Sequence, residues 1–184
     1  MLQWDTLRRA MMRAVSALIL ACLLVGAADA QTKEKEVRNT KHWDLAKKDQ
    51  LAIGGYDPVA YFKEGGGKPR KGAAQFGHVH AGVKYHFASQ QNLERFKKNP
   101  RKYEPAYGGW CAWAMRDGEK VGVDPKSFLV RNERLFLFYD GVWGDTRAKW
   151  AKGTHDQLAQ AADGRWKKIS GEDPRKKQTL PKKP

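Results

Sequence analysis

One short stretch of the sequence contains two residues that could bind a soft metal. In residues 103–118, YEPAYGGWCAWAMRDG, Cys111 and Met115 are four residues apart. Side chains at that spacing share a face on a helix and also on a strand. A thiolate and a thioether are soft ligands that favour Cu(I). This pattern makes Cys111 and Met115 a candidate copper site.

Three histidines could complete such a site. They lie in AQFGHVHAGVKYHFAS, residues 74–89, which is typical of two short strands joined by a tight turn at Ala81-Gly82. The alternation of a strand puts His78 and His80 on one face, and His86 on the other. The candidate metal ligands are therefore Cys111, Met115, His78, His80 and His86.

Cys111 also has simpler interpretations. A free cysteine among aromatic residues commonly packs as a small apolar core residue. A nucleophilic cysteine needs a base and an orienting group beside it, and nothing around Cys111 resembles a cysteine hydrolase. No C-x-x-C pair is present for redox work. We therefore predict no catalytic residues and a protein that is not an enzyme, with a thiol enzyme as the least favoured alternative.

The N-terminal segment predicts export. Arg8, Arg9 and Arg13 precede an apolar run that ends at ADA before Gln31, the order of a secretory signal peptide. The run is too short for a good membrane span. Residues 1–30 are thus a predicted signal peptide, cleaved near Ala30, and the mature protein is periplasmic or secreted. Lipoprotein processing at Cys22 and twin-arginine export stay open as minority alternatives.

Export also constrains how the cysteines can be used. The sequence has two cysteines, and Cys22 leaves with the signal peptide. The single remaining thiol cannot form an internal disulfide, so the fold must be held by its own core.

Positive charge dominates the chain, whose net charge is +15. Eight lysine or arginine residues in 164–184 oppose only Glu172 and Asp173. An exported basic tail is expected to meet anionic envelope surfaces rather than nucleic acid, and no basic stripe interleaved with aromatic residues suggests nucleic-acid binding. The candidate anionic-surface residues are Lys167, Lys168, Arg175, Lys176, Lys177, Lys182 and Lys183.

The rest of the sequence predicts an α+β fold, a small single domain of short antiparallel strands with several short helices. Residues 31–49 form a charged spacer, residues 50–166 the domain, and residues 167–184 a basic, disordered tail. Beside the histidine hairpin, Ser89 caps a helix over 90–98. Strands are expected over 128–130 and 135–139, and helices over 147–152 and 154–162.

An ordered set of motifs resembles a known family. GYDPVAYF at 55–62, YHFAS at 85–89, NLERF, NPRKYEPAYGGWCAWAM, VDP, RLFLFYD and AADGRW together resemble a YHS-domain protein of the exported bacterial kind, over residues 50–166. The resemblance implies a small α+β module and an association with heavy-metal handling. In metal-binding relatives, cysteines stand at the positions of Ala60, Ala88 and Asn92, so the resemblance does not supply that thiolate site here.

Two functions from different classes follow. The first is a non-catalytic binding module for a soft metal such as copper, or for another small ligand. The second is an envelope interaction module that binds anionic surfaces through its basic tail.

Overall fold

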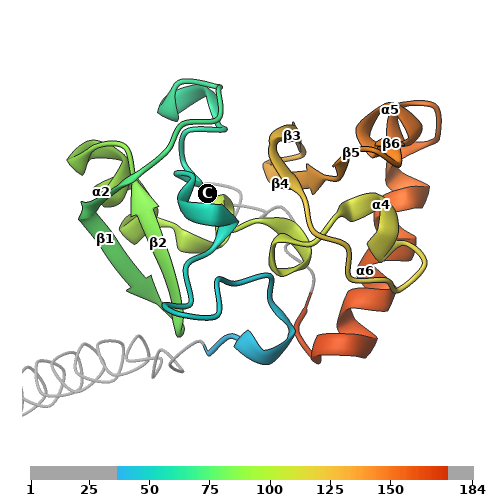
Figure 1. Cartoon of the computed structure of the whole chain (residues 1–184), viewed down its shortest axis with the longest axis horizontal. Coiled ribbons are helices and arrows are strands. Elements are labelled where there is room, and N and C mark those ends of the chain that lie inside the picture. The colour runs from blue at the N-terminus through green and yellow to red at the C-terminus, as the bar shows by residue number, and fades with distance from the viewer. Residues whose placement is uncertain (1–36, 174–184) are drawn as a thin grey trace, which may run out of the picture. The chain divides into compact units, whose positions relative to one another are not determined.

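The computed structural model describes residues 37–173, which lie in one compact unit that begins at Val37. Its fold is α+β, as predicted, with short helices and three small antiparallel sheets of two strands each (Figure 1). This part of the chain contains no helix that is both long and apolar enough to cross a membrane. The elements are η1 Thr40–His42, η2 Ile53–Gly55, η3 Lys63–Gly65, β1 Ala73–His80, β2 Val83–Phe87, α2 Gln90–Lys98, α3 Pro100–Tyr103, η4 Ala106–Gly109, α4 Ala112–Met115, β3 Asp124–Arg131, β4 Arg134–Phe138, β5 Asp140–Gly141, β6 Gly144–Asp145, α5 Thr146–Ala151 and α6 His155–Ser170.

The β1–β2 hairpin and α2 confirm the sequence prediction in most details. His78 pairs with Tyr85 across the hairpin, and the turn residues Ala81 and Gly82 both have positive φ. The Ser89 side chain accepts a hydrogen bond from the Asn92 backbone N–H and begins α2 at the predicted residue. Simple alternation from a turn at Ala81-Gly82 predicts that Phe76 pairs with Phe87. This pairing is wrong, because a register shift places Ala73 opposite Phe87.

The second half of the chain pairs β3 with β4 and ends in two helices. The β3–β4 turn uses Asn132 and Glu133 with positive φ. Helix α6 does not end at Asp163-Gly164, as the sequence suggested, but continues to Ser170 and ends at Gly171 with φ 75°. The extension buries Trp166 in the core, and that burial outweighs the cost of about 1 kcal/mol for a glycine inside a helix. The predicted tail therefore begins too early, because Lys167 and Lys168 belong to the last turn of α6.

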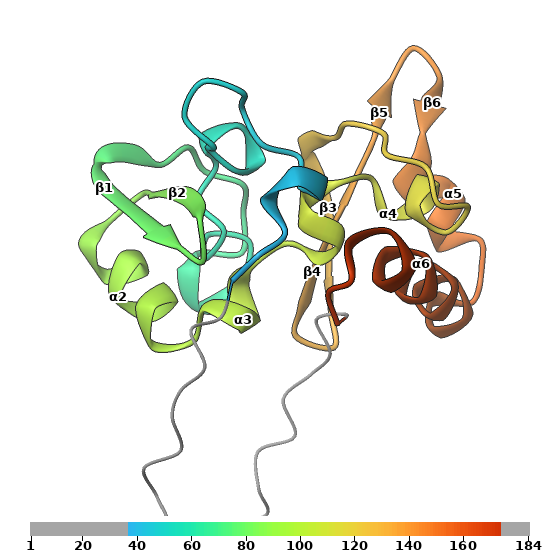
Figure 2. The same ribbon diagram turned by 90° about the horizontal axis from the view of Figure 1, so that it is seen from below.

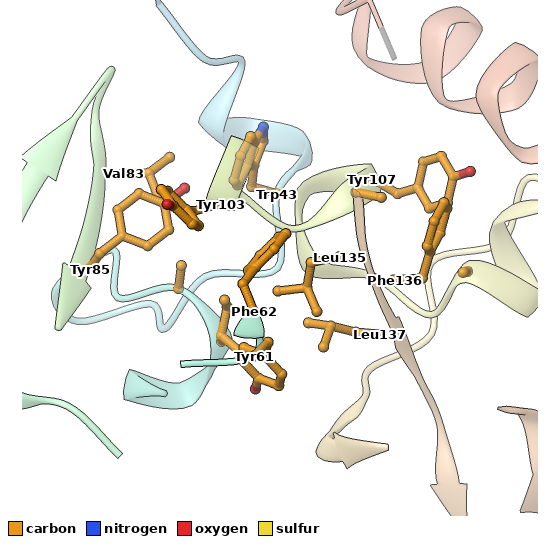
Figure 3. Packing of buried hydrophobic residues seen from close by; sticks show 14 of the residues in the cluster. Trp43, Tyr61, Phe62, Val83, Tyr85, Tyr103, Tyr107, Leu135, Phe136 and Leu137 are labelled. Atoms are coloured by element: carbon orange, nitrogen blue, oxygen red, sulfur yellow. The ribbon is translucent and has the colours of Figure 1, made fainter. Parts of the chain in front are cut away.

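An aromatic core joins the two halves. In Figure 3, Phe62, Leu135 and Leu137 lie between Tyr85 and Tyr103 on one side and Tyr107 and Phe136 on the other. These residues belong to a single cluster of buried side chains that comes from β2, α3, η4 and β4. Such rings contribute large buried areas, so a domain of this size needs no disulfide.

Part of the segment predicted as a charged spacer contributes to this core. Trp43 is buried, and Gly108 of η4 lies directly against it. A Cβ atom on Gly108 would come within 2.9 Å of both the Trp43 and Trp166 side chains. Only glycine fits between these two rings, at a backbone φ of 61°. The ordered domain thus begins before the predicted boundary at residue 50.

Candidate functional site

Cys111 is buried and contacts both ends of a small hairpin. Its Sγ atom accepts a hydrogen bond from the Tyr139 backbone N–H at 3.3 Å and lies 3.4 Å from Thr146 Oγ1. Tyr139 precedes β5, and Thr146 follows β6. The thiol therefore holds the base of the β5–β6 hairpin, which agrees with the interpretation of Cys111 as a core residue.

Met115 lies close to Cys111, as its spacing predicted, and the two residues share a helical turn. The Met115 backbone N–H donates to the Cys111 carbonyl at 2.9 Å, and both side chains are fully buried. The helix, α4, covers only the four residues Ala112–Met115, and Cys111 is its N-cap. Local spacing thus placed these residues correctly relative to one another, but it could not show that both are enclosed by protein.

The three histidines lie on the β1–β2 hairpin, close to α2. His78 and His80 contact the Phe96 ring of α2, with ring centroids 6.3 Å and 5.9 Å apart. Burial lowers the pKa of His78, and the nearby Lys97 lowers it further. His86 lies on the other face, and its Nε2 atom is buried without a hydrogen-bond partner in the described part of the chain. The histidines are thus packing residues of this hairpin.

The structure does not bring the predicted metal ligands together. In Figures 1 and 2, β1, β2 and α2 lie at one end of the described chain, while α4, α5 and α6 lie at the other. The histidines belong to the first end, and Cys111 and Met115 to the second. Among residues 37–173, no group of three or more histidine, cysteine, aspartate or glutamate side chains is arranged to hold a metal ion. The copper site stays a prediction, without a ligand cluster in this region.

The residues at the positions of the relatives' cysteines, Ala60, Ala88 and Asn92, all donate hydrogen bonds to Asp57. Asp57 Oδ1 accepts from the backbone N–H groups of Val59 and Ala60, at 2.8 Å and 3.3 Å. Its Oδ2 accepts from the Ala88 N–H at 2.9 Å and from Asn92 Nδ2 at 2.7 Å. Four donors thus satisfy a fully buried carboxylate, and one of them is the side chain of Asn92. The Asp57 motif has a structural role here.

A second buried hydrogen-bond network joins Arg38, near the start of the described domain, to Glu104 and Tyr85. Arg38 donates to both carboxylate oxygens of Glu104, at 3.0 Å and 2.6 Å, and the Tyr85 hydroxyl donates to the same carboxylate at 3.2 Å. All three residues are buried. Removing either Arg38 or Glu104 is expected to leave the other residue as an uncompensated buried charge. Arg38 therefore fixes the start of the domain to the YHS-like motif.

Sequence reasoning missed a polar cleft between the β3–β4 turn and α6. It is open, has a volume of about 840 Å³, and has a largely buried ion pair in its wall. Arg134 donates to both oxygens of Asp163, at 2.7 Å and 3.1 Å, and the Tyr107 hydroxyl donates to Asp163 at 3.0 Å. The one sequence signal for this cleft was Arg134, a charged residue at the start of the apolar strand RLFLF. The lining residues are Asn132, Arg134, His155, Asp156, Ala159, Gln160, Asp163, Gly164, Lys167 and Asp173.

His155 in this cleft is held as a neutral ring. The Trp150 Nε1–H can only donate, and it donates to His155 Nδ1 at 3.0 Å. That bond leaves the histidine proton on Nε2. Burial lowers the pKa of His155, and the positive charges of Arg131 and Arg134 lower it further. The site can thus present a neutral imidazole at neutral pH.

Two of the predicted anionic-surface residues lie in the described chain. Lys167 and Lys168 are exposed in the last turn of α6, where positive charge suits the helix dipole. Lys167 contacts Asp173 at 2.8 Å, and this contact raises the pKa of Lys167. The other predicted residues, Arg175, Lys176, Lys177, Lys182 and Lys183, lie outside the described residues.

Comparison with known proteins gives one result. No curated protein and no solved structure matches the chain. The family model of the YHS domain, a domain associated with possible metal handling, matches residues 66–107. The matched segment contains β1, β2, α2 and α3. The YHS resemblance predicted from the sequence is therefore confirmed for residues 66–107 of this chain.

Proposed function

We propose that this protein is an exported, non-catalytic module that binds anionic surfaces of the cell envelope. The mature form would begin near Gln31, after removal of residues 1–30. The observation that carries the proposal is the charge of the described domain itself. Residues 37–173 contain 25 lysine and arginine residues against 16 aspartate and glutamate residues, a net charge of +9. The domain is thus strongly basic without any contribution from residues 174–184.

The excess positive charge belongs to the surface of the domain. Arg38 is paired with the buried Glu104, and Arg134 with the largely buried Asp163, so these charges cancel in pairs. Asp57 is enclosed and bonded to uncharged N–H donors. The remaining basic residues therefore outnumber the remaining acidic ones on the outside. A surface of this kind attracts anionic headgroups over roughly a Debye length, about 10 Å at 0.1 M salt.

Metal handling is the finer alternative suggested by the YHS resemblance. Copper(I) at Cys111 and Met115, with His78, His80 or His86, would need the two ends of the domain to rearrange. Titration of the metal-free mature chain with Cu(I) under reducing conditions tests it. Tighter binding by the wild type than by Cys111→Ala would support copper handling over surface binding.

Vesicle sedimentation tests the proposed function. The chain beginning at Gln31 is expected to bind vesicles that contain phosphatidylglycerol and not vesicles of phosphatidylcholine alone. Raising the salt from about 0.01 M to about 1 M shortens the Debye length from about 30 Å to about 3 Å and should release the protein. A second chain that ends at Asp173 should keep part of this binding, because the domain is itself basic. Binding that depends on neither the lipid charge nor the salt concentration would refute the proposal.

A further inference from the structure

The β5–β6 hairpin exposes two large apolar side chains at its tip. Val142 and Trp143 connect the two strands, and they are 92% and 81% exposed. Trp43, Trp150 and Trp166 are buried, and Trp110 and Trp113 are partly buried against the core. Among the described tryptophans, Trp143 alone projects into solvent. Figure 2 shows that the hairpin stands out from the rest of the domain.

The tip is held in place by specific contacts. The Trp143 backbone N–H donates to the Tyr139 hydroxyl at 3.2 Å. The Tyr139 ring lies directly over Gly141, where a Cβ atom would come within 2.7 Å of the hydroxyl oxygen. Gly141 therefore lets the tyrosine fold back along the hairpin and bond to its tip. This bond restrains the tip in the unbound chain, which lowers the ordering entropy that binding through it would cost.

The base of the hairpin is fixed as well. The Thr146 side chain donates to the Tyr139 carbonyl at 2.7 Å, and Cys111 contacts both residues. Asp145 accepts from the backbone N–H groups of Arg147 and Ala148, so its carboxylate caps α5. The hairpin is thus attached to the core at its base and presents an apolar tip.

We propose that Trp143, with Val142, inserts into the headgroup region of anionic lipid, an inference that rests on the proposed function. Tryptophan favours the membrane interface, because its large ring is apolar and its N–H can still bond to water or headgroups. The net charge of +9 brings the domain to an anionic surface. Helix α5, which follows directly, adds the exposed Arg147 and Lys149, while Asp140 is the one exposed acidic residue of the hairpin.

Charge also argues against self-association through this tip. A second copy of the chain carries the same positive charge and would be repelled at low salt. An anionic bilayer instead attracts the basic surface of the domain, and its headgroup region accommodates the Trp143 ring. A single inserted tryptophan is a shallow anchor, and it adds affinity and orientation to electrostatic binding.

Trp143→Ala in the chain beginning at Gln31 tests the inference, with Val79→Ala as the matched control. Val79 is 60% exposed but lies on β1, away from this hairpin. We expect Trp143→Ala to weaken binding to phosphatidylglycerol-containing vesicles about tenfold or more, and Val79→Ala to leave it unchanged. Brominated lipids should quench part of the wild-type tryptophan fluorescence, and that part should be absent in Trp143→Ala. Because the side chain is exposed, both variants should unfold at the wild-type urea midpoint.

The outcomes separate the inference from the proposed function. If the wild type binds anionic vesicles in a salt-sensitive manner and Trp143→Ala binds equally well, the inference is overturned and the proposed function stands. If the wild type does not bind, the proposed function fails and the inference with it. Gel filtration that shows a wild-type dimer, dissociated by Trp143→Ala, would make the tip a self-association surface and would also overturn the inference.

Discussion

Replacing Asp57 by asparagine tests whether the most prominent motif of the sequence serves the fold. The change keeps the size of the side chain but replaces one acceptor oxygen with an NH₂ group. That group would face N–H donors that now bond to Oδ1 or Oδ2 at 2.7–3.3 Å. At least one buried backbone donor and the Asn92 amide, or two backbone donors, would lose their acceptor.

The magnitude follows from the number of orphaned groups. A buried donor without a partner costs about 1–3 kcal/mol. Two such donors, partly offset because the buried negative charge is removed, predict a loss of about 3 kcal/mol. Small domains have a total stability of about 5–15 kcal/mol, so Asp57→Asn should remain folded but be clearly destabilised.

A second Asp-Pro pair in the chain provides the control. Asp124 also precedes a proline, and its carboxylate accepts from the Lys126 N–H at 2.9 Å, but this bond is exposed. Water can replace the lost partner there, so Asp124→Asn should cost less than about 1 kcal/mol. Urea unfolding followed by tryptophan fluorescence gives both values, provided that the m-values match the wild type.

A double variant of Asp57 and Asn92 makes the test more specific. Asn92 donates to Asp57 and accepts from Arg95 at 3.0 Å, so it positions its amide toward the carboxylate. The double variant Asp57→Asn with Asn92→Ala should cost less than the sum of the single changes, because the two side chains interact directly. Equal effects of Asp57→Asn and Asp124→Asn, or strict additivity with Asn92→Ala, would refute the structural role of the motif.

Two further predictions concern the other buried polar groups. Because burial lowers the pKa of His155 below its unfolded value of 6.5, the unfolded chain binds the extra proton first, and the free energy of unfolding should fall as the pH drops from 7 to 5. His155→Gln, whose amide oxygen can accept the Trp150 N–H, should lose less stability over that range, and an unchanged slope would contradict the assignment. His78 and His42, whose pKa values are also lowered, contribute to the remaining slope. Cys111 should react with iodoacetamide slowly in the folded mature chain and rapidly in urea, because the native thiol is fully buried. Rapid native alkylation would instead favour the thiol-enzyme hypothesis, and Cys111→Ala should cost about 1–2 kcal/mol in the same unfolding assay, since the Tyr139 N–H loses its acceptor.

The parts of the fold that local sequence predicts are those in which neighbouring residues make the decisive contacts. Ser89 caps α2 three residues from its partner, and Ala81-Gly82 turns the hairpin that pairs His78 with Tyr85. The spacing of Cys111 and Met115 likewise predicted that the two residues lie close together, and the structure joins them by a backbone hydrogen bond. These interactions need no knowledge of the remaining chain.

Contacts between distant residues could not be predicted in this way. Arg38 and Glu104 are 66 residues apart, and Arg134 and Asp163 are 29 apart. Helix α6 continues past Gly164 because Trp166 finds a buried position, which its own propensity does not reveal. The role of Cys111 depends on the distant residues Tyr139 and Thr146. Its spacing from Met115 alone suggested a metal site that the structure does not assemble.

The location of the YHS match narrows where the function should be sought. Within residues 66–107, the polar motif residues Tyr85, Asn92 and Glu104 are bonded to other buried protein groups, and they have little capacity left for a ligand. The exposed tip at Trp143 and the cleft beside Arg134 both lie outside that segment. The YHS match therefore accounts for the part of the scaffold from β1 to α3, whereas the exposed tip and the cleft come from β3 to α6. Substitutions at the exposed tip around Trp143 should change binding with little loss of stability, and those of the buried polar residues in the matched segment should do the reverse.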